Sequence, residues 1–222
     1  MNPMVEGTEA VIAGETLELF AARAVFRRST STLLVADPHF GKAAAFRAAG
    51  VFVPEATTAA TLARLDALLE ATSARRLIFL GDFLHAKEGR HPGTLQTLSQ
   101  WRLRHSAVEM ILVRGNHDEC AGDPPEAMRI ACVDGPVLEP PFAYAHRPRE
   151  IRDAYVLAGH LHPGVVLLGA GRQRERLACF WFGSRVGVLP AFGEFTGLAD
   201  VAPAPGDGVW VVADDQVVDV SG

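Results

Sequence analysis

The sequence LLVADPHFGK at residues 33–42 decides the fold, because an apolar run passes at once into a cluster of polar side chains. The same arrangement recurs four more times. Apolar runs at residues 77–80, 110–113, 142–145 and 155–158 lead, directly or after one residue, into GDFLH (81–85), GNHD (115–118), His146 and GHLH (159–162). Short runs of this kind are typical of strands buried on both faces. We therefore expect five buried strands with polar residues at their carboxyl ends.

The segments around these runs predict how the strands are covered. Residues 54–71 open with Pro54 and Glu55 and carry leucines at helical spacing, at positions 62, 65, 68 and 69. Residues 93–104 form a second, less regular helix candidate. After Ala154 the pattern changes to closely spaced strands, at residues 165–168, 177–182, 186–189 and 209–212. An α/β first half followed by a β-rich second half predicts helices covering sheets that pack face to face.

Composition narrows the class of protein. The 222 residues are 49% hydrophobic, with no repeat and no linker, so we expect one domain over residues 1–222. The net charge of −5 argues against a protein that coats nucleic acid with a basic surface. No apolar run approaches the roughly 18 residues of a membrane span. The three cysteines form no C-x-x-C pair, and the N-terminus resembles no signal peptide. These features favour a cytoplasmic protein without a membrane partner.

The side chains at the strand ends suit a metal site. They are Asp37, His39, Asp82, Asn116, His117, His146, His160 and His162. Carboxylates, imidazoles and an amide oxygen without a thiolate suit Mn, Fe, Zn or Co better than Ca. In an extended chain, residues 37 and 39 point to one side, as do residues 160 and 162, so each pair can address one centre. His117 would then point away from Asn116, which favours a role beside the metals.

The ordered series D-x-H, G-D, G-N-H-D, H and G-H-x-H resembles the calcineurin-like metallophosphoesterase superfamily over residues 37–162. The resemblance implies a four-layer α-β-β-α sandwich in the α/β class, with two divalent metal ions at the strand carboxyl ends. It implies that the first ion is held by Asp37, His39, Asp82 and His162. It implies that the second is held by Asp82, Asn116, His146 and His160.

The same resemblance implies a mechanism. A hydroxide bridging the two metals attacks phosphorus in line, and the metals neutralise the phosphoryl oxygens. His117 is then the catalytic histidine, acting as general acid on the leaving oxygen. Asp118 is a candidate partner that orients His117, although adjacent residues on an extended strand point apart.

Departures from the superfamily pattern narrow the expected activity. Protein phosphatases of the superfamily carry G-D-x-x-D-R-G, whereas this chain has GDFLHAK at residues 81–87, with His85 in place of the second Asp. Residues 36–42, Gly50, Pro54 and LPAFGEFTG at residues 189–197 resemble the bacterial DNA-ligase-associated branch. That resemblance implies a manganese-dependent, single-strand DNA endonuclease in DNA repair. It also implies association with an ATP-dependent DNA ligase, a helicase and an exonuclease.

Candidate substrate contacts are Lys42, His85, Arg114 and Arg147, which lie within or beside the motifs. Two divalent cations would add about four positive charges and reverse the local sign of an acidic chain. Two other functions stay open. A phosphoesterase for cyclic or other small nucleotides would need the same metals and only a tight pocket. A non-catalytic scaffold of the same fold would be marked by loss of the ligands or of His117, and none is lost here.

Overall fold

The computed structural model describes residues 6–48, 50, 57–168, 174–194 and 196–221. The strands are β1 (Gly7–Ile12), β2 (Glu15–Phe20), β3 (Ala24–Arg27), β4 (Thr32–Val35), β5 (Arg76–Phe79), β6 (Glu109–Val113), β7 (Ala131–Val133), β8 (Val137–Glu139), β9 (Phe142–Ala145), β10 (Tyr155–Ala158), β11 (Pro163–Leu168), β12 (Arg174–Phe182), β13 (Val186–Val188), β14 (Ala199–Asp200), β15 (Gly208–Ala213) and β16 (Gln216–Asp219). The α-helices are α1 (Lys42–Ala48), α2 (Thr57–Thr72), α3 (Pro92–Arg104) and α4 (Asn116–Ala121).

The described residues form two sheets. The first has the order β1-β2-β3-β4-β5-β6-β7, antiparallel from β1 to β4 and parallel from β4 to β7. The second runs β14-β11-β12-β13-β10-β9-β8, with β15 and β16 attached through β12. Val35 lies opposite Phe79, and Ala145 opposite Ala158. These registers bring the carboxyl ends of neighbouring parallel strands to the same edge.

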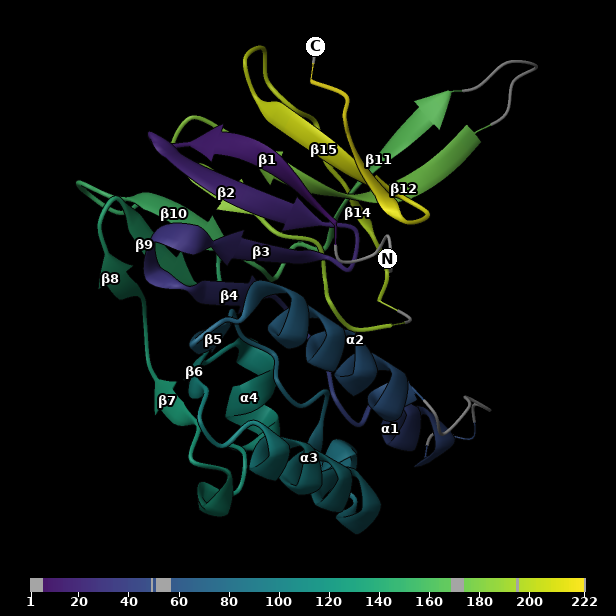
Figure 1. The fold of residues 1–222 in the computed structure, drawn as a ribbon. Coiled ribbons are helices and arrows are strands. Elements are labelled where there is room, and N and C mark those ends of the chain that lie inside the picture. The colour runs from purple at the N-terminus through teal and green to yellow at the C-terminus, as the bar shows by residue number, and fades with distance from the viewer. Residues whose placement is uncertain (1–5, 49, 51–56, 169–173, 195, 222) are drawn as a thin grey trace.

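Two hydrophobic cores hold the layers together (Figure 1). One lies between the first sheet and the helices, where Leu65 of α2 and Trp101 of α3 are fully buried. The other lies between the two sheets, where Leu34 and Ile78 of the first sheet pack with Phe180 of the second. Because successive residues of a strand point to opposite faces, β4 and β5 supply apolar side chains to both cores. This explains their unbroken apolar sequences.

The predicted elements are largely confirmed. All five strands that precede a polar cluster are present as β4, β5, β6, β9 and β10, and each of the four later strand predictions matches β11, β12, β13 or β15. The predicted helices correspond to α2 and α3, although Pro54 and Glu55 lie outside the described residues. The three N-terminal strands β1–β3 were not predicted. Nor was α4, which begins inside the GNHD motif.

The mixed α/β class with two packed sheets is confirmed, but the expected second helix layer is not seen in the part of the chain that the structure describes. There, α1–α4 all precede β7, and the figure shows them on the first sheet (Figure 1). On the outer face of the second sheet, Ala143, Ala145, Val156 and Ala158 pack with Ile151 and Val186, and Cys179, Val209 and Val211 pack with Val165, Leu167 and Trp181. Among the described residues, no α-helix contributes to either cluster.

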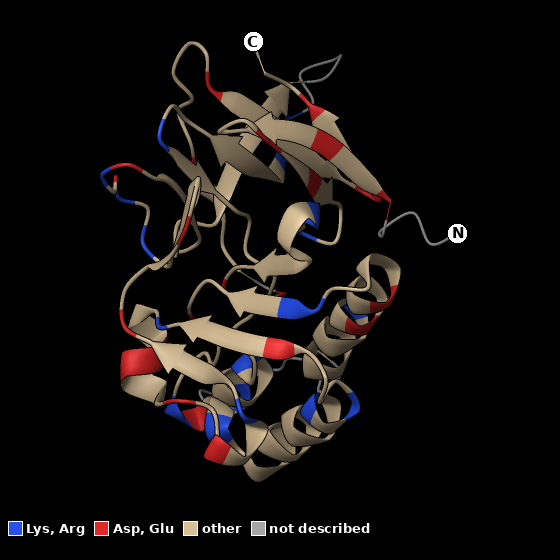
Figure 2. Cartoon of the chain, turned by 60° about the vertical axis from the view of Figure 1, so that its left-hand side comes forward, with Lys and Arg blue, Asp and Glu red and all other residues tan. Residues whose placement is uncertain are grey.

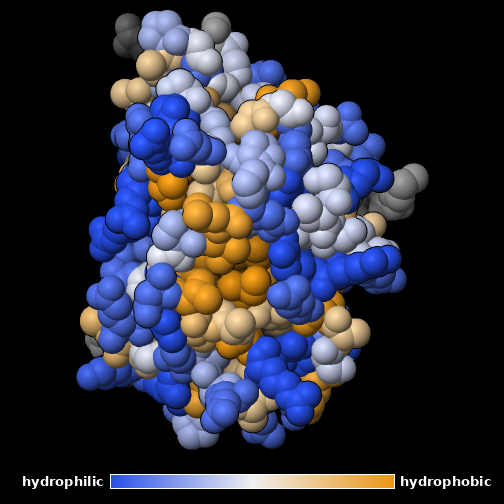
Figure 3. Space-filling model, turned by 90° about the vertical axis from the view of Figure 1, so that its left-hand side faces the viewer, coloured by the Kyte–Doolittle hydropathy of each residue, from blue (hydrophilic) through white to orange (hydrophobic). Residues whose placement is uncertain are grey.

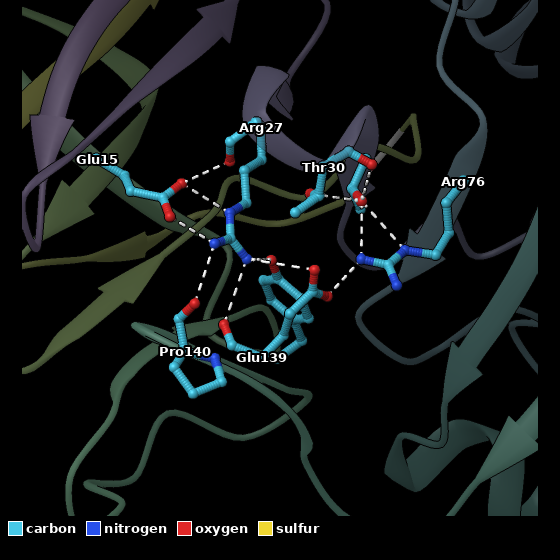
Figure 4. Close-up of polar contacts among 9 residues, drawn as sticks. Glu15, Arg27, Thr30, Arg76, Glu139 and Pro140 are labelled. Atoms are coloured by element: carbon cyan, nitrogen blue, oxygen red, sulfur yellow. Dashed lines mark hydrogen bonds and ion pairs between the residues drawn. The ribbon is translucent and has the colours of Figure 1, made fainter.

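A buried arginine joins the two sheets at the ends of the strands that lie away from the polar clusters (Figure 4). Arg27 is only 3% exposed. Its guanidinium donates to both carboxylate oxygens of Glu15 at 2.5 and 2.7 Å, to the carbonyl oxygen of Pro140 at 3.1 Å and to the hydroxyl of Tyr144 at 3.1 Å. Glu139 also pairs with Arg27 and with Arg76 of β5. A buried charge is tolerated because each of its donors has a partner.

The surface is mixed in character. In the view of Figure 2, acidic and basic positions are interspersed over helices, strands and loops. Figure 3 shows an exposed apolar area on the side of the molecule where β7 and β8 lie, and Val133 and Val137 of these edge strands are only partly buried. Among the described residues, none of the helices has the length and apolar character required to cross a membrane.

Candidate metal centre

The polar clusters converge at one edge of the two sheets. Asp37 follows β4, Asp82 follows β5, and Asn116 follows β6 in the first sheet. His146 follows β9, and His160 follows β10 in the second. Main-chain hydrogen bonds tie the loops together, from His39 N–H to the carbonyl oxygen of Asp82 at 2.9 Å and from Gly159 N–H to that of His146 at 3.1 Å. The sheets therefore present these side chains to a shared space.

The backbone at these positions is left-handed, which corrects the extended geometry expected from the sequence. Asp37, His39, Asp82, His160 and His162 all have φ between 46° and 71°. Non-glycine residues seldom adopt this conformation, and several together mark a site that the surrounding fold holds under strain. The extended-chain argument that put His160 and His162 at one centre was wrong. His117 is also not extended, because it lies in the first turn of α4.

Three glycines make room for the ligand side chains. A Cβ at Gly81 would overlap the ring of His146, and a Cβ at Gly115 would overlap the carboxylate of Asp82. A Cβ at Gly159 would lie 2.6 Å from Oδ2 of Asp37. Each glycine comes directly before a polar residue in the sequence, a signal that the sequence analysis did not use. The close approach of backbone and ligand requires glycine at all three positions.

The structure brings the proposed ligands into two groups. Asp37, His39 and His162 can present one ligand atom each within 4.8 Å of one another, and so can Asp82, His146 and His160. The groups adjoin one another. Nε2 of His39 lies 3.9 Å from Oδ2 of Asp82, and Nδ1 of His146 lies 3.5 Å from Oδ1 of Asp37. His39, His85 and His117 can also present one nitrogen each within 4.8 Å of one another.

The residues fit a divalent metal. Among the described residues, most buried side-chain atoms without a hydrogen-bond partner lie here, and they include Oδ1 of Asp37, Nδ1 of His39 and Nε2 of His162. Burial and the nearby carboxylate of Asp82 raise the pKa of Asp37 well above its usual value, and a bound cation would favour its ionised form. Burial lowers the pKa of His39 to about 2, which keeps its imidazole neutral, the form that binds metals.

His146 is oriented by the backbone. Its Nδ1 lies 3.0 Å from the carbonyl oxygen of Leu80, and because a carbonyl only accepts, Nδ1 carries the proton. Nε2 is left as the ligating nitrogen, 3.0 Å from Oδ1 of Asn116 and 3.5 Å from Oδ1 of Asp82. A histidine ligand whose other nitrogen donates to a carbonyl is a recurrent feature of metal sites. His146 and Asn116 are thus placed to serve the same centre.

His117 is also oriented by a main-chain carbonyl, that of His85, and not by the Asp118 carboxylate considered in the sequence analysis. Its Nδ1 lies 2.5 Å from the carbonyl oxygen of His85, and the two imidazole rings stack with centroids 5.2 Å apart. Nε2 of His117 lies 3.9 Å from Oδ2 of Asp82. The hydrogen-bond partner of His117 Nδ1 is thus the main chain of His85, whereas the carboxylate of Asp118, the candidate partner, bonds to Gly115 and Phe83.

Asp118 instead ties two motif loops together. Its buried carboxylate accepts the main-chain N–H of Gly115 at 2.8 Å and that of Phe83 at 2.9 Å. The first bond caps α4, and the second reaches the loop after β5. Burial raises the pKa of Asp118. Asp118 therefore positions the loops that carry Asp82 and Asn116, and its carboxylate bonds to the main chain of Gly115 and Phe83 and not to His117.

Of the four candidate substrate contacts, Lys42 and His85 lie close to His39, a proposed metal ligand. The ammonium of Lys42, at the start of α1, lies 5.7 Å from the ring centroid of Phe46 and lowers the pKa of His39 and His85. His85 packs against His39 and His117, and burial together with Lys42 lowers its pKa to about 4.

Arg147 and Arg114 differ in what they contact. The guanidinium of Arg147 is 3.3 Å from Nε2 of His160, beside the proposed ligands. Arg114 makes ion pairs with Asp123 at 2.7 Å and with Asp134 at 2.9 Å. Its charge is already balanced, so it is the least available of the four for a substrate phosphate.

Comparison with known proteins identifies the class. The family model for calcineurin-like phosphoesterases matches residues 30–175, which contain the five motifs at the strand ends. The chain belongs to this family and is a metal-dependent phosphoesterase. The family resemblance seen in the motifs is thereby confirmed.

Two solved structures are similar to this chain over most of its length. It is 42% identical to Pseudomonas putida nuclease MPE, over 96% of this chain and 100% of that one, with a TM-score of 0.85. A phosphoesterase from E. coli, Yfce, aligns over 86% of this chain and 98% of that one, at 13% identity and a TM-score of 0.42, which is too distant to carry an argument. A search of curated proteins finds no significant match.

Proposed function

We propose that this phosphoesterase is a manganese-dependent, single-strand DNA endonuclease that acts in DNA repair. The observation that carries the proposal is the likeness, over nearly the whole chain, to a protein described as a nuclease. The donor set of carboxylates and imidazoles supports manganese, with Fe, Zn or Co as alternatives.

The proposal assigns a role to each ligand. Asp37, His39 and His162 would hold one divalent ion, Asn116, His146 and His160 would hold the other, and Asp82 would contribute to both. When bound, the two ions activate water as a nucleophile and neutralise charge on the phosphoryl oxygens.

His117 is proposed as the general acid. Its Nδ1 proton is engaged by the carbonyl of His85, so the proton that it gives to the leaving oxygen comes from Nε2. That nitrogen is on the side of Asp82, and the ring is partly exposed, so a substrate oxygen can reach it. The His85 ring stacks on His117 and restricts its rotation. Lys42 supplies positive charge near His39 and His85, where a substrate phosphate is attracted.

A substrate panel tests the proposal. The purified protein with Mn is assayed on circular and linear single-stranded DNA, duplex DNA, cyclic nucleotides, a phosphomonoester and a phosphoprotein. We expect cleavage of circular single-stranded DNA, and the Asp82→Asn variant prepared in parallel excludes a contaminating nuclease. Selective hydrolysis of cyclic nucleotides would replace the proposal with the small-nucleotide alternative. Selective hydrolysis of the phosphoprotein would contradict both.

The finer context is also a proposal. Residues 189–197 and the FGK of the first motif support a place beside an ATP-dependent DNA ligase, a helicase and an exonuclease in one repair system. We propose that the chain acts as one domain in the cytoplasm and produces ends for these enzymes. Sealing of the cleaved strand by such a ligase, after end processing, is the measurement that tests the order of steps.

A further inference from the structure

A groove opens beside the candidate metal centre. It has a volume of about 260 Å³, and Asn116 and His146 form part of its lining. Arg114, Arg147 and Arg149 also line it. Since two of the proposed ligands belong to its wall, a chain bound at the metals can continue into the groove without leaving the surface.

The arginines of this groove differ in whether their charge is already balanced. Arg114 is paired with Asp123 and Asp134. Within the described ranges, neither Arg147 nor Arg149 has a carboxylate partner within ion-pair distance. Other arginines nearby do: Arg152 pairs with Asp153 at 3.4 Å, and Arg185 pairs with Glu150 at 3.2 Å.

The sequence Arg147-Pro148-Arg149 therefore presents two unbalanced guanidinium groups in the loop between β9 and β10, directly after a proposed ligand. The groove wall also contains one carboxylate, Glu119. Guanidinium groups bind phosphate oxygens through two parallel hydrogen bonds, and two of them exceed the charge of one carboxylate. This chemistry suits a phosphodiester backbone.

We propose that Arg147 and Arg149 bind a backbone phosphate next to the scissile one, on the segment of the strand that keeps the cleaved phosphoryl group. His117 packs with His39 and His85, whereas Arg147 contacts His160, which packs on His146. The leaving oxygen faces His117, so the segment that does not leave extends toward Arg147. The inference rests on the proposed function and adds a neighbouring-phosphate subsite to it.

The consequence is that the groove discriminates by substrate length. A small phosphodiester such as bis(p-nitrophenyl) phosphate has no second phosphate and cannot use the groove. An oligonucleotide can. Arg149 is the better position to substitute, because Arg147 also contacts His160, a proposed metal ligand, and its loss could disturb the metal centre. Arg152, in the same loop but paired with Asp153 and outside the groove, provides a matched control.

The experiment compares Arg149→Ala, Arg152→Ala and the unaltered protein on a single-stranded 30-mer and on bis(p-nitrophenyl) phosphate, with Mn and at several salt concentrations. For Arg149→Ala we expect the ratio of kcat/KM on the 30-mer to kcat/KM on the small ester to fall about threefold to tenfold, through a higher KM. The slope of log(kcat/KM) against log salt should become shallower by about 0.7, the value for one lost phosphate contact on a single strand. Arg152→Ala should match the unaltered protein.

Two results would overturn the subsite. One is an unchanged ratio and salt slope in Arg149→Ala, and the other is an equal loss on both substrates, which would mean that Arg149 supports the metal centre. Failure of the proposed function is distinguishable, because it would appear in the unaltered protein as hydrolysis of the small ester without cleavage of DNA. In that case the subsite proposal falls with it.

Discussion

Nδ1 of His117 lies 2.5 Å from the main-chain carbonyl oxygen of His85. This contact joins the first turn of α4 to the loop after β5, so the imidazole of His117 is aligned by the backbone of the neighbouring motif. A backbone acceptor has no charge to change with pH and cannot be removed by substitution of its own side chain. The orientation of His117 therefore depends on how the two loops pack.

The role of His117 can be tested by removing its imidazole. We expect His117→Ala to retain its metal ions, because His117 belongs to neither of the two proposed sets of metal ligands. Activity on substrates with poor leaving groups should fall by about 10²- to 10⁴-fold, the usual contribution of general acid catalysis. The loss should be much smaller with a p-nitrophenolate leaving group, which needs little protonation. An equal loss on both would contradict the acid role.

Asp82 is expected to matter to both metal ions. Its carboxylate lies 3.9 Å from Nε2 of His39 in one group and 3.5 Å from Nε2 of His146 in the other. Asp82→Asn removes the negative charge while keeping the shape, so we expect loss of both ions and of all measurable activity. Elemental analysis of the purified variant checks this. Full metal content would refute the shared role.

The glycines that directly precede the proposed metal ligands should not tolerate substitution by alanine. Gly115→Ala places a Cβ against the carboxylate of Asp82, which has no room to move away because its Oδ1 also accepts the N–H of His117. We expect at least a tenfold loss of metal affinity. Gly93→Ala is the control, since its Cβ would have only ordinary contact, 3.4 Å, with the His91 ring. Titration with Mn, followed by thermal stability, measures both, and equal affinities would show that the loops adapt.

Metal removal should lower thermal stability. The ions hold together buried carboxylates that otherwise repel, and any ligand that binds only the folded state stabilises it. At a hundredfold excess over its dissociation constant, one ion contributes about 2.7 kcal/mol, or about 5–10 °C in Tm for a chain of this size. Scanning calorimetry with Mn and then with EDTA gives the shift. A Tm independent of chelator would mean that the centre does not bind the ion tightly.

The Arg27 cluster should make stability depend on pH on the acid side. The hydrogen bond from Arg27 lowers the pKa of Glu15 in the folded state. A carboxyl with a lowered folded pKa contributes stability that is complete above its unfolded pKa, about 4.5, and is lost as the pH falls through the folded pKa. Glu15→Gln should therefore unfold at lower urea than the unaltered protein at pH 7, with the difference shrinking below pH 4.5.

The matched control for this measurement is Glu175→Gln, on an exposed part of β12. It should follow the unaltered protein at every pH. A difference between Glu15→Gln and the unaltered protein that stays constant down to pH 3 would mean that the Glu15 carboxylate does not lose its partner on acidification.

Much of the fold could be predicted because the burial of the central strands is visible in their sequences. β4, β5, β6, β9 and β10 are buried on both faces and read as unbroken apolar runs. β2 gave no such signal, because Thr16 and Glu18 alternate with Leu17 and Leu19. In β1 the apolar run covers only residues 10–12, after Thr8 and Glu9. The helix α4 was missed because its six residues are too few for a periodic pattern.

The sequence by itself determined which side chains form the site, since the strand ends that carry Asp37, Asp82, Asn116 and His146 follow from local patterns of burial and polarity. Only the tertiary structure decided how they are grouped. His160 joins Asp82 while His162 joins Asp37, and His117 turns to the carbonyl of His85. Those outcomes depend on sheet register and on left-handed turns at the strand ends. Residues far apart in the chain impose both, so no local pattern contains them.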